Sequence, residues 1–290
     1  MRPLRTLLFI PGNRERMLEK GPTAGADALL PDLEDAVPLG DKPAARELLR
    51  QWIPNQSAPV YVRLNAVETG LTRDDIEAVA VKGLTGVFVP KVQQVEEVRQ
   101  VAAWLDELEP RAGLASGSVE VVPMLESALG VYRGYALATA SPRVASLCFA
   151  SGENGDFQTD LGCDWSLEGP EIMYARQKTV LDARAAGIMY PLDGVYVRLD
   201  DEEGLIRDTT LAKRLGFKGR CAIHPRQVEP MNRVFTPSLE EVGYYRRLLE
   251  AFDQAVAENK ASINFEGKMV DYAMAARARS VLALADAIGL

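Results

Sequence analysis

The sequence has few residues of the kinds that bind zinc or form disulfides. It contains one histidine, His224, and its three cysteines, Cys148, Cys163 and Cys221, form no CxxC motif or close pair. A single imidazole excludes zinc sites that need two or three histidines. Unpaired cysteines argue against a disulfide-rich secreted scaffold. We therefore expect a cytoplasmic protein with reduced thiols.

The sequence also lacks long apolar runs and basic clusters. No apolar stretch approaches the roughly 20 residues that span a bilayer, and no charged segment followed by an apolar one opens the chain. The net charge is −8, with no run rich in Lys or Arg. We expect neither a nucleic-acid surface nor an anionic-membrane surface. An anionic substrate would then be held by a few local cations.

Strand-like apolar runs alternate with helical segments along most of the chain. Helical spacing is clear in Val95 to Leu108 and in Gly169 to Ala186. This alternation predicts a closed (β/α)8 TIM barrel of parallel strands. An open doubly wound sheet is the alternative, but no GxGxxG motif follows the first run. The predicted strands lie near residues 5–10, 28–33, 59–65, 86–91, 120–126, 144–151, 190–196 and 219–224.

The pattern changes to helix only after Pro237. Leu239 to Glu258 and Met269 to Ile288 are predicted to be helices, joined by the polar stretch KASINFEGK. Eight strands already complete a barrel, so this tail lies outside it. We predict a catalytic barrel domain over residues 1–236 and a C-terminal helical arm over residues 237–290, acting as a lid, an oligomer arm or both.

Residues capable of polar chemistry end most of the predicted strands. The C-terminal ends of barrel strands converge on one mouth, where barrel enzymes carry their active sites. Glu126 and Asp156 are predicted at the ends of neighbouring strands, and a Mg2+ site uses one or two carboxylates. The alternative is that one of them caps the following helix. The residues predicted at the mouth are Asp32, Glu34, Asp35, Arg63, Lys91, Glu126, Asp156, Asp193 and His224.

The first acidic cluster and Arg63 allow two interpretations. Asp32, Glu34 and Asp35 alternate across a strand end, so at most two can face the mouth and hold waters on a metal. Equally, one of them could cap a loop or pair with an arginine. Arg63 presents a planar fork suited to a carboxylate or a thioester oxygen. In a structural role it would instead pair with Asp32 or Glu34.

Covalent catalysis is disfavoured at the predicted mouth. Lys91 would need a depressed pKa to form a Schiff base, and an acid-rich mouth has the opposite effect. We predict a structural or electrostatic role for it. The chain has no GxSxG motif, and Ser151 lacks an evident partner, so His224 is interpreted as a hydrogen-bonded histidine at the rim.

Motifs along nearly the whole chain resemble one family. The sequence is similar to the citrate lyase beta-subunit-like group of the HpcH/HpaI aldolase superfamily. The resemblance implies a TIM barrel, usually assembled as trimers, that acts on acyl-CoA thioesters with Mg2+. It is carried by LLFIPGNRERMLEK, GADALLPDLEDAV, VYVRLNA, VFVPKV, PMLESALG, GDFQTDLG, PLDGV, LGFKGRCAIHPRQV and GKMVDYAMAARA.

The resemblance also implies roles for residues of the barrel. Glu126 and Asp156 would be the metal ligands, with Glu126 also beside the substrate. Arg63 would contact the carboxylate or carbonyl oxygens of the substrate. From the acidic cluster itself, and not from the resemblance, Glu34 and Asp35 are predicted to stand behind these groups and hold waters on the metal.

Two further regions are assigned by the same resemblance. Arg14 and Lys20, in the first loop and helix, would meet the phosphates of CoA. Asp271 matches an acid of the arm that reaches a neighbouring subunit's site in malyl-CoA and citramalyl-CoA lyases. An arm that carries Asp271 favours a stand-alone enzyme.

The predicted activity is that of a Mg2+-dependent carbon–carbon lyase in a homotrimer or larger homo-oligomer. It would cleave a carboxylated 3-hydroxyacyl-CoA, such as citramalyl-CoA or malyl-CoA, to acetyl-CoA and a 2-oxo acid, or catalyse the reverse condensation. One alternative is a citrate lyase beta subunit acting on a citryl thioester held by an acyl-carrier protein. Others are a malyl-CoA thioesterase and a non-catalytic binding protein for acyl-CoA or organic acids.

Overall fold

The chain folds into two compact units. The computed structural model describes residues 2–150 and 152–290, and its contacts separate residues 3–233 from residues 234–290. Ser151, weighed above as a nucleophile, lies outside the described residues. None of the described helices is long and apolar enough to cross a membrane.

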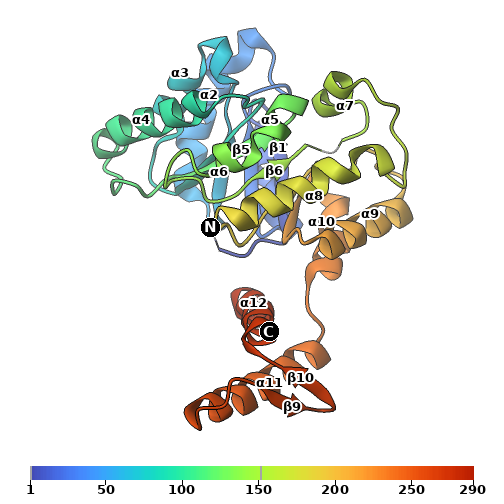
Figure 1. The fold of residues 1–290 in the computed structure, drawn as a ribbon. Helices are drawn as coiled ribbons and strands as arrows, with labels where there is room; N and C mark the ends of the chain where they lie inside the picture. Colours follow the sequence, from blue (N-terminus) through green and yellow to red (C-terminus); the bar gives the residue numbers. More distant parts are fainter. Residues whose placement is uncertain (1, 151) are drawn as a thin grey trace. The chain divides into compact units, whose positions relative to one another are not determined.

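The first unit is a closed barrel of parallel strands (Figure 1), which confirms the predicted (β/α)8 fold. Each strand pairs with its neighbour in sequence, and β1 pairs with β8 to close the ring. The strands are β1 (Thr6–Pro11), β2 (Ala28–Asp32), β3 (Val60–Arg63), β4 (Leu84–Val89), β5 (Glu120–Leu125), β6 (Cys148–Phe149), β7 (Leu192–Asp193) and β8 (Gly219–Ala222).

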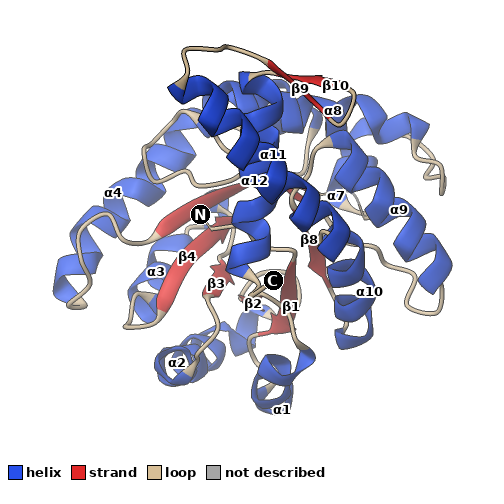
Figure 2. Cartoon of the chain, turned by 90° about the horizontal axis from the view of Figure 1, so that it is seen from below, coloured by secondary structure: helices blue, strands red, loops and turns tan. Residues whose placement is uncertain are grey.

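Helices surround this barrel and connect its strands, as the view in Figure 2 shows for those around β1 to β4. Because parallel strands need crossover connections, a helix between strands is the expected arrangement. The helices are α1 (Glu15–Lys20), α2 (Lys42–Trp52), α3 (Thr72–Val79), α4 (Val95–Arg111), α5 (Ala128–Tyr132), α6 (Gly134–Ala138), α7 (Asp156–Leu161), α8 (Pro170–Ala185), α9 (Glu202–Leu215) and α10 (Pro225–Phe235).

Alternation along each strand divides the apolar side chains between two cores. Leu7 belongs to the cluster inside the barrel, whereas its neighbour Leu8 packs in the layer between barrel and helices. Inside, the rings of Tyr61 and Phe88 meet edge to face with centroids 5.8 Å apart. Gly86 leaves room for Tyr61, since a Cβ there would lie 2.7 Å from its ring. A packed interior of this kind is a core and not a pore.

Strands β6 and β7 are much shorter than the sequence predicts. The segment before β6 contributes only an isolated bridge between Val144 and Val121. Ser146 Oγ donates to the carbonyl of Tyr190 at 2.8 Å, so a side-chain bond joins the two segments before their ladder begins. The barrel is therefore least regular beside β6, where the chain leaves for the loop that carries Asp156.

The second unit has its own small core and one element that the sequence did not predict. It consists of α11 (Leu239–Ala257), β9 (Ile263–Phe265), β10 (Lys268–Val270) and α12 (Tyr272–Ala287). The polar stretch predicted as a simple connection is an antiparallel hairpin, and the last helix begins at Tyr272 and not at Met269. Glu266 and Gly267 both have positive φ, the two-residue turn that suits the twist of a hairpin.

Candidate active site

Arg63, the last residue of β3, is held by two acids, Asp32 at the end of β2 and Glu34 just after it. Its Nε and Nη2 donate to the two carboxylate oxygens of Asp32 at 2.7 and 2.6 Å, and Nη1 lies 2.8 Å from Glu34 Oε2. The guanidinium also lies over the ring of Phe9. The structural pairing considered for Arg63 is therefore present, and only Nη1 is not committed to Asp32.

Asp32 is itself fixed by backbone donors. The N–H groups of Glu34 and Ala36 donate to its two oxygens at 2.9 and 3.0 Å. Lys42, which sequence analysis missed, donates to the carbonyls of Leu33 and Glu34 at 2.7 and 2.9 Å. This buried lysine ties the acidic loop to α2. Its only sequence signal was a cation close behind the acidic cluster.

Glu126 follows β5 directly and is buried. One oxygen accepts the N–H of Lys91 at 3.1 Å. Burial and, next to it, the charge of Glu34 raise the pKa of Glu126, Arg63 lowers it, and the net pKa is about 7. A carboxylate with this pKa lacks sufficient positive charge around it, so the site favours either a proton or an additional cation.

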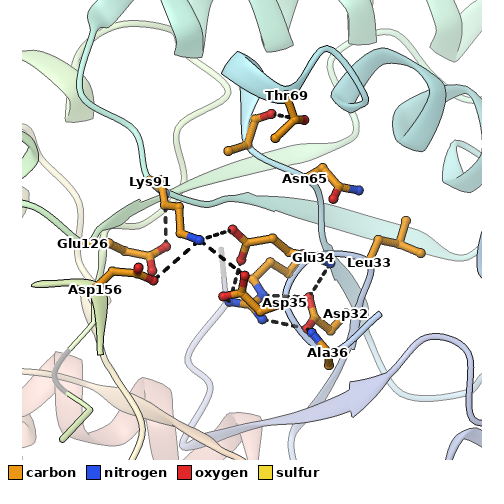
Figure 3. Close-up of polar contacts among 12 residues, drawn as sticks. Asp32, Leu33, Glu34, Asp35, Ala36, Asn65, Thr69, Lys91, Glu126 and Asp156 are labelled. Carbon is orange, nitrogen blue, oxygen red and sulfur yellow. Dashed lines mark hydrogen bonds and ion pairs between the residues drawn. The ribbon is translucent and has the colours of Figure 1, made fainter. Parts of the chain in front are cut away.

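Lys91 stands between the two groups of acids (Figure 3). Its Nζ lies 2.9 Å from Glu34 Oε1, 3.3 Å from Asp35 Oδ1 and 3.6 Å from Asp156 Oδ2. Burial lowers the pKa of Lys91, but the hydrogen bond to Glu34 and the charges of the three acids raise it by more. The amine is therefore protonated, which fits the predicted electrostatic role and not Schiff-base chemistry.

Asp156 reaches the mouth by a different route from the one predicted. Strand β6 ends at Phe149, and Asp156 opens helix α7 after Gly155, so it does not end a strand. Its side chain is half exposed and approaches the amine of Lys91. The loop from β6 to α7 thus carries this carboxylate to the mouth, while Glu126 extends directly from its strand.

Asp193 and His224 do not join these residues, although the sequence grouped them. Asp193 is buried and pairs with Arg176 of α8 at 2.5 Å. This ion pair joins β7 to α8, so Asp193 has a structural role. His224 Nδ1 accepts the N–H of Arg226 at 3.2 Å, a local turn contact consistent with a rim histidine.

The remaining predicted residues belong to α1 and to the second unit. Arg14 and Lys20 are exposed at the beginning and end of α1. Asp271 belongs to the second unit, where it caps α12 by accepting the N–H groups of Ala273 and Met274 at 3.0 and 3.1 Å. This cap is a sufficient structural reason for an acid at that position.

The oxygen atoms at the mouth suit a hard cation whose coordination shell the protein fills only in part. Within residues 2–150 and 152–290, no three His, Cys, Asp or Glu side chains gather into a complete metal site. Glu126 and Asp156 offer only oxygen, and both contact Lys91. Mg2+ is commonly bound by one or two carboxylates with water and substrate oxygens. These residues therefore fit that ion.

The pattern of one family covers most of the barrel. The HpcH/HpaI aldolase/citrate lyase family matches residues 5–225. The chain belongs to this family. The match begins just before β1 and ends at the start of α10, so it includes Arg63, Glu126 and Asp156.

Curated relatives of this family member carry three different names. A citrate lyase subunit beta of Leuconostoc mesenteroides subsp. cremoris is 34% identical, covering 98% of this chain and 93% of its own. A (3S)-malyl-CoA thioesterase of Cereibacter sphaeroides is 33% identical over 99% and 96%. The mitochondrial citramalyl-CoA lyase of Mus musculus is 29% identical over 99% and 87%. Since all three span nearly the whole chain, length does not distinguish them and the arm alone does not favour one.

A solved structure is similar along the full length of this family member. Protein CitE from Mycobacterium tuberculosis, in complex with magnesium, acetoacetate and coenzyme A, has a TM-score of 0.74 and 30% identity. The match covers 98% of both chains. Its bound groups belong to the chemical classes that the resemblance implied.

Proposed function

We propose that this chain is a Mg2+-dependent carbon–carbon lyase for carboxylated 3-hydroxyacyl-CoA thioesters. The leading substrates are citramalyl-CoA and malyl-CoA, cleaved to acetyl-CoA and a 2-oxo acid or formed in the reverse condensation. The observation that carries the proposal is the convergence of Glu126 and Asp156 on Lys91, which shares Glu34 with Arg63, at the mouth of the barrel. Membership of the HpcH/HpaI aldolase/citrate lyase family supports it.

Glu126 and Asp156 would hold the metal ion. Glu34, Asp35 and Asp156 surround the amine of Lys91, and Glu126 accepts the backbone N–H of the same residue. This concentration of negative charge favours the entry of a divalent cation. Bound Mg2+ would supply Lewis-acid stabilisation of the oxygen on which charge develops. Glu34 and Asp35, in the loop after β2, would orient water molecules around the ion.

Arg63 would face the substrate through Nη1, the nitrogen that is not held by Asp32 and that Glu34 would share with the substrate. Its Nε and Nη2 are held by Asp32, so the guanidinium is fixed in orientation before substrate arrives. During cleavage the hydroxyl proton would pass to solvent, the oxygen left behind would form the carbonyl of the 2-oxo acid, and the electrons of the breaking C2–C3 bond would pass into the thioester enolate. A positive group in a fixed position at the substrate carboxylate or carbonyl oxygen stabilises that charge without reorganising.

We also propose a role for the second unit and a homotrimeric assembly. The enolate carbon needs a proton to become the methyl group of acetyl-CoA, and Asp271 of a neighbouring copy would exchange it. Arg14 and Lys20, both exposed, would bind CoA phosphates. The three cysteines are free thiols, which is compatible with the cytoplasmic location that we propose.

A product analysis with purified protein tests the function. Malyl-CoA, citramalyl-CoA and citryl-CoA are each incubated with Mg2+ and with EDTA, and the products are separated by mass spectrometry. We expect Mg2+-dependent acetyl-CoA together with glyoxylate or pyruvate. Free CoA with an intact hydroxy acid would instead indicate a thioesterase, and no turnover of any thioester would contradict the enzyme proposal.

A citrate lyase beta subunit is the second candidate. It is favoured by the 34% identity to the Leuconostoc protein over nearly the full length of both chains. The same assay distinguishes it when citryl thioester is presented on an acyl-carrier protein. Formation of oxaloacetate from that substrate, without cleavage of malyl-CoA or citramalyl-CoA, would favour this candidate over the first.

A further inference from the structure

The backbone of Lys91 has an unusual conformation. Its φ is +55°, in the left-handed region that residues other than glycine adopt rarely. In this conformation the N–H of Lys91 donates to Glu126 Oε1 at 3.1 Å. Residues in sparsely populated backbone regions gather at functional sites, where surrounding contacts hold them. Here the residue with the unusual φ, Lys91, donates its N–H to Glu126, the buried acid of the site.

The amine of Lys91 has one close partner and two weaker ones. Glu34 is buried and lies 2.9 Å from Nζ, whereas Asp35 and Asp156 are half exposed at 3.3 and 3.6 Å. The contact with Asp156 is the longest of the three, and the Asp156 side chain is half exposed to solvent, so this contact is weak and can be exchanged for another cation. The amine can keep Glu34 when Asp156 turns to another cation.

We propose that Lys91 is the positioning residue of the metal site. Its N–H orients Glu126, and its amine serves as an internal counter-ion that neutralises Asp156 until a divalent cation displaces it. The inference rests on the proposed function, because it requires Glu126 and Asp156 to be the ligands. It goes further by assigning a metal-dependent exchange to a residue that lies between both of them.

The proposal predicts the sign of an effect on metal affinity. An ammonium group next to the ligands repels a second cation and competes with it for Asp156. Removing only the amine should therefore tighten Mg2+ binding. If Lys91 merely maintained the architecture of the site, its removal would loosen the ligands and weaken Mg2+ binding instead.

Calorimetric titration of Mg2+ into the full-length protein without substrate tests this sign. Lys91→Met keeps a long, unbranched side chain without the charge. Lys91→Gly accepts the positive φ while retaining the N–H that donates to Glu126. We expect both variants to bind Mg2+ about tenfold more tightly than wild type, equivalent to about 1.4 kcal/mol. Lys91→Arg, the matched control, keeps the charge and should stay within about threefold of wild type.

Thermal unfolding gives a second readout that does not depend on turnover. The increase in Tm between EDTA and Mg2+ should be larger in Lys91→Met and Lys91→Gly than in wild type, because the metal-free variants lack a counter-ion. Equal or weaker Mg2+ affinity in both folded variants overturns the Lys91 inference alone. Absence of Mg2+ binding by wild type, or unchanged binding by Glu126→Gln, overturns the proposed metal site together with it.

Discussion

Two clusters of buried charge lie at different strands of the same barrel and differ in balance. Between β7, β8 and their helices, Arg176 pairs with Asp193 at 2.5 Å and with Asp208 at 2.7 Å. Arg220 pairs with Asp208 at 2.5 Å. Two acids therefore meet two arginines, and the net charge of this cluster is 2 − 2 = 0. All four charges have partners inside the protein.

The cluster at the mouth, in contrast, has an excess of acid. Arg63 and Lys91 contact Asp32, Glu34, Asp35, Glu126 and Asp156, which gives 2 − 5 = −3 when all are ionised. Lys42, whose amine donates to carbonyl oxygens of the same loop, also interacts with the charges of Asp32, Glu34 and Asp35. Counting it gives 3 − 5 = −2, so the excess of acid remains. The raised pKa of Glu126, about 7, follows first from burial and then from the charges of neighbouring acids.

The contrast separates structural charge from charge that awaits a ligand. A balanced buried network satisfies its own members and needs nothing from solution. An unbalanced one beside an open mouth can be completed only by protons or by a cation. Changes in the mouth should therefore alter activity and metal binding, while changes in the balanced cluster should alter stability.

The largest expected effect is at the ligands. Replacing Glu126 with Gln or Asp156 with Asn keeps the shape of the side chain but removes a negative donor. We expect turnover to fall by about a thousandfold or more, equivalent to about 4 kcal/mol, with much weaker Mg2+ binding. Steady-state assays and calorimetry measure the two effects, and circular dichroism checks that the fold persists. Wild-type Mg2+ affinity in either variant would remove that residue from the ligand set.

The balanced cluster should respond in the opposite way. Asp193→Asn leaves the buried Arg176 short of one anion, so the free energy of unfolding should drop by about 3 kcal/mol. Activity per folded molecule should stay near wild type. Asp35→Asn, at a half-exposed acid of the mouth, is the matched control and should change stability by less than about 0.5 kcal/mol. A loss of activity without a loss of stability in Asp193→Asn would break the comparison.

The pH dependence of stability sharpens the contrast further. The pKa of Glu126 is about 7 in the folded chain against 4.5 unfolded, so folding favours its protonated form. Its contribution is complete below about pH 4.5 and is lost as pH rises through about 7, at most about 3 kcal/mol. Urea unfolding in EDTA at pH 5.5 and pH 8 should show this decrease, and Glu126→Gln should reduce it. An identical slope in that variant would assign the dependence to other groups.

Sequence could predict the mouth only in part, for physical reasons that differ between residues. Arg63 and Glu126 end or directly follow regular strands, so strand counting located them. Asp156 depends on a loop and the start of a short helix, whose path no periodicity encodes. Asp193 ends a strand as expected. However, it forms an ion pair with Arg176, 17 positions earlier in the chain, and so does not join the acids of the mouth.

The fold was more predictable than these pairings. Alternating apolar runs and helices specify a barrel regardless of which charges meet. Partners such as Lys91 and Asp35 are 56 positions apart, and only the closed barrel brings them together. The hairpin of the second unit was missed because each of its strands has three residues, too few for a period of two to stand out.

A smaller effect is expected when the charge of Arg63 is kept but its geometry is lost. Arg63→Lys cannot hold both oxygens of Asp32 and still present a donor at the position of Nη1. We expect kcat/KM to fall at least about tenfold, or roughly 1.4 kcal/mol, with Mg2+ affinity little changed. Unaltered kinetics would place Arg63 with the balanced, structural charges.

The smallest signal concerns Asp271, which belongs to neither cluster. If it acts in a neighbouring copy's site, an inactive Asp271→Asn chain can supply intact ligands, and an inactive Glu126→Gln chain can supply an intact arm. With equal mixing across a heterologous interface, about a quarter of the sites would combine both. We therefore expect recovery of up to about a quarter of wild-type activity after subunit exchange. Native mass spectrometry must show mixed oligomers. Mixed oligomers without recovery would leave Asp271 as the N-cap of α12, the one role its hydrogen bonds require.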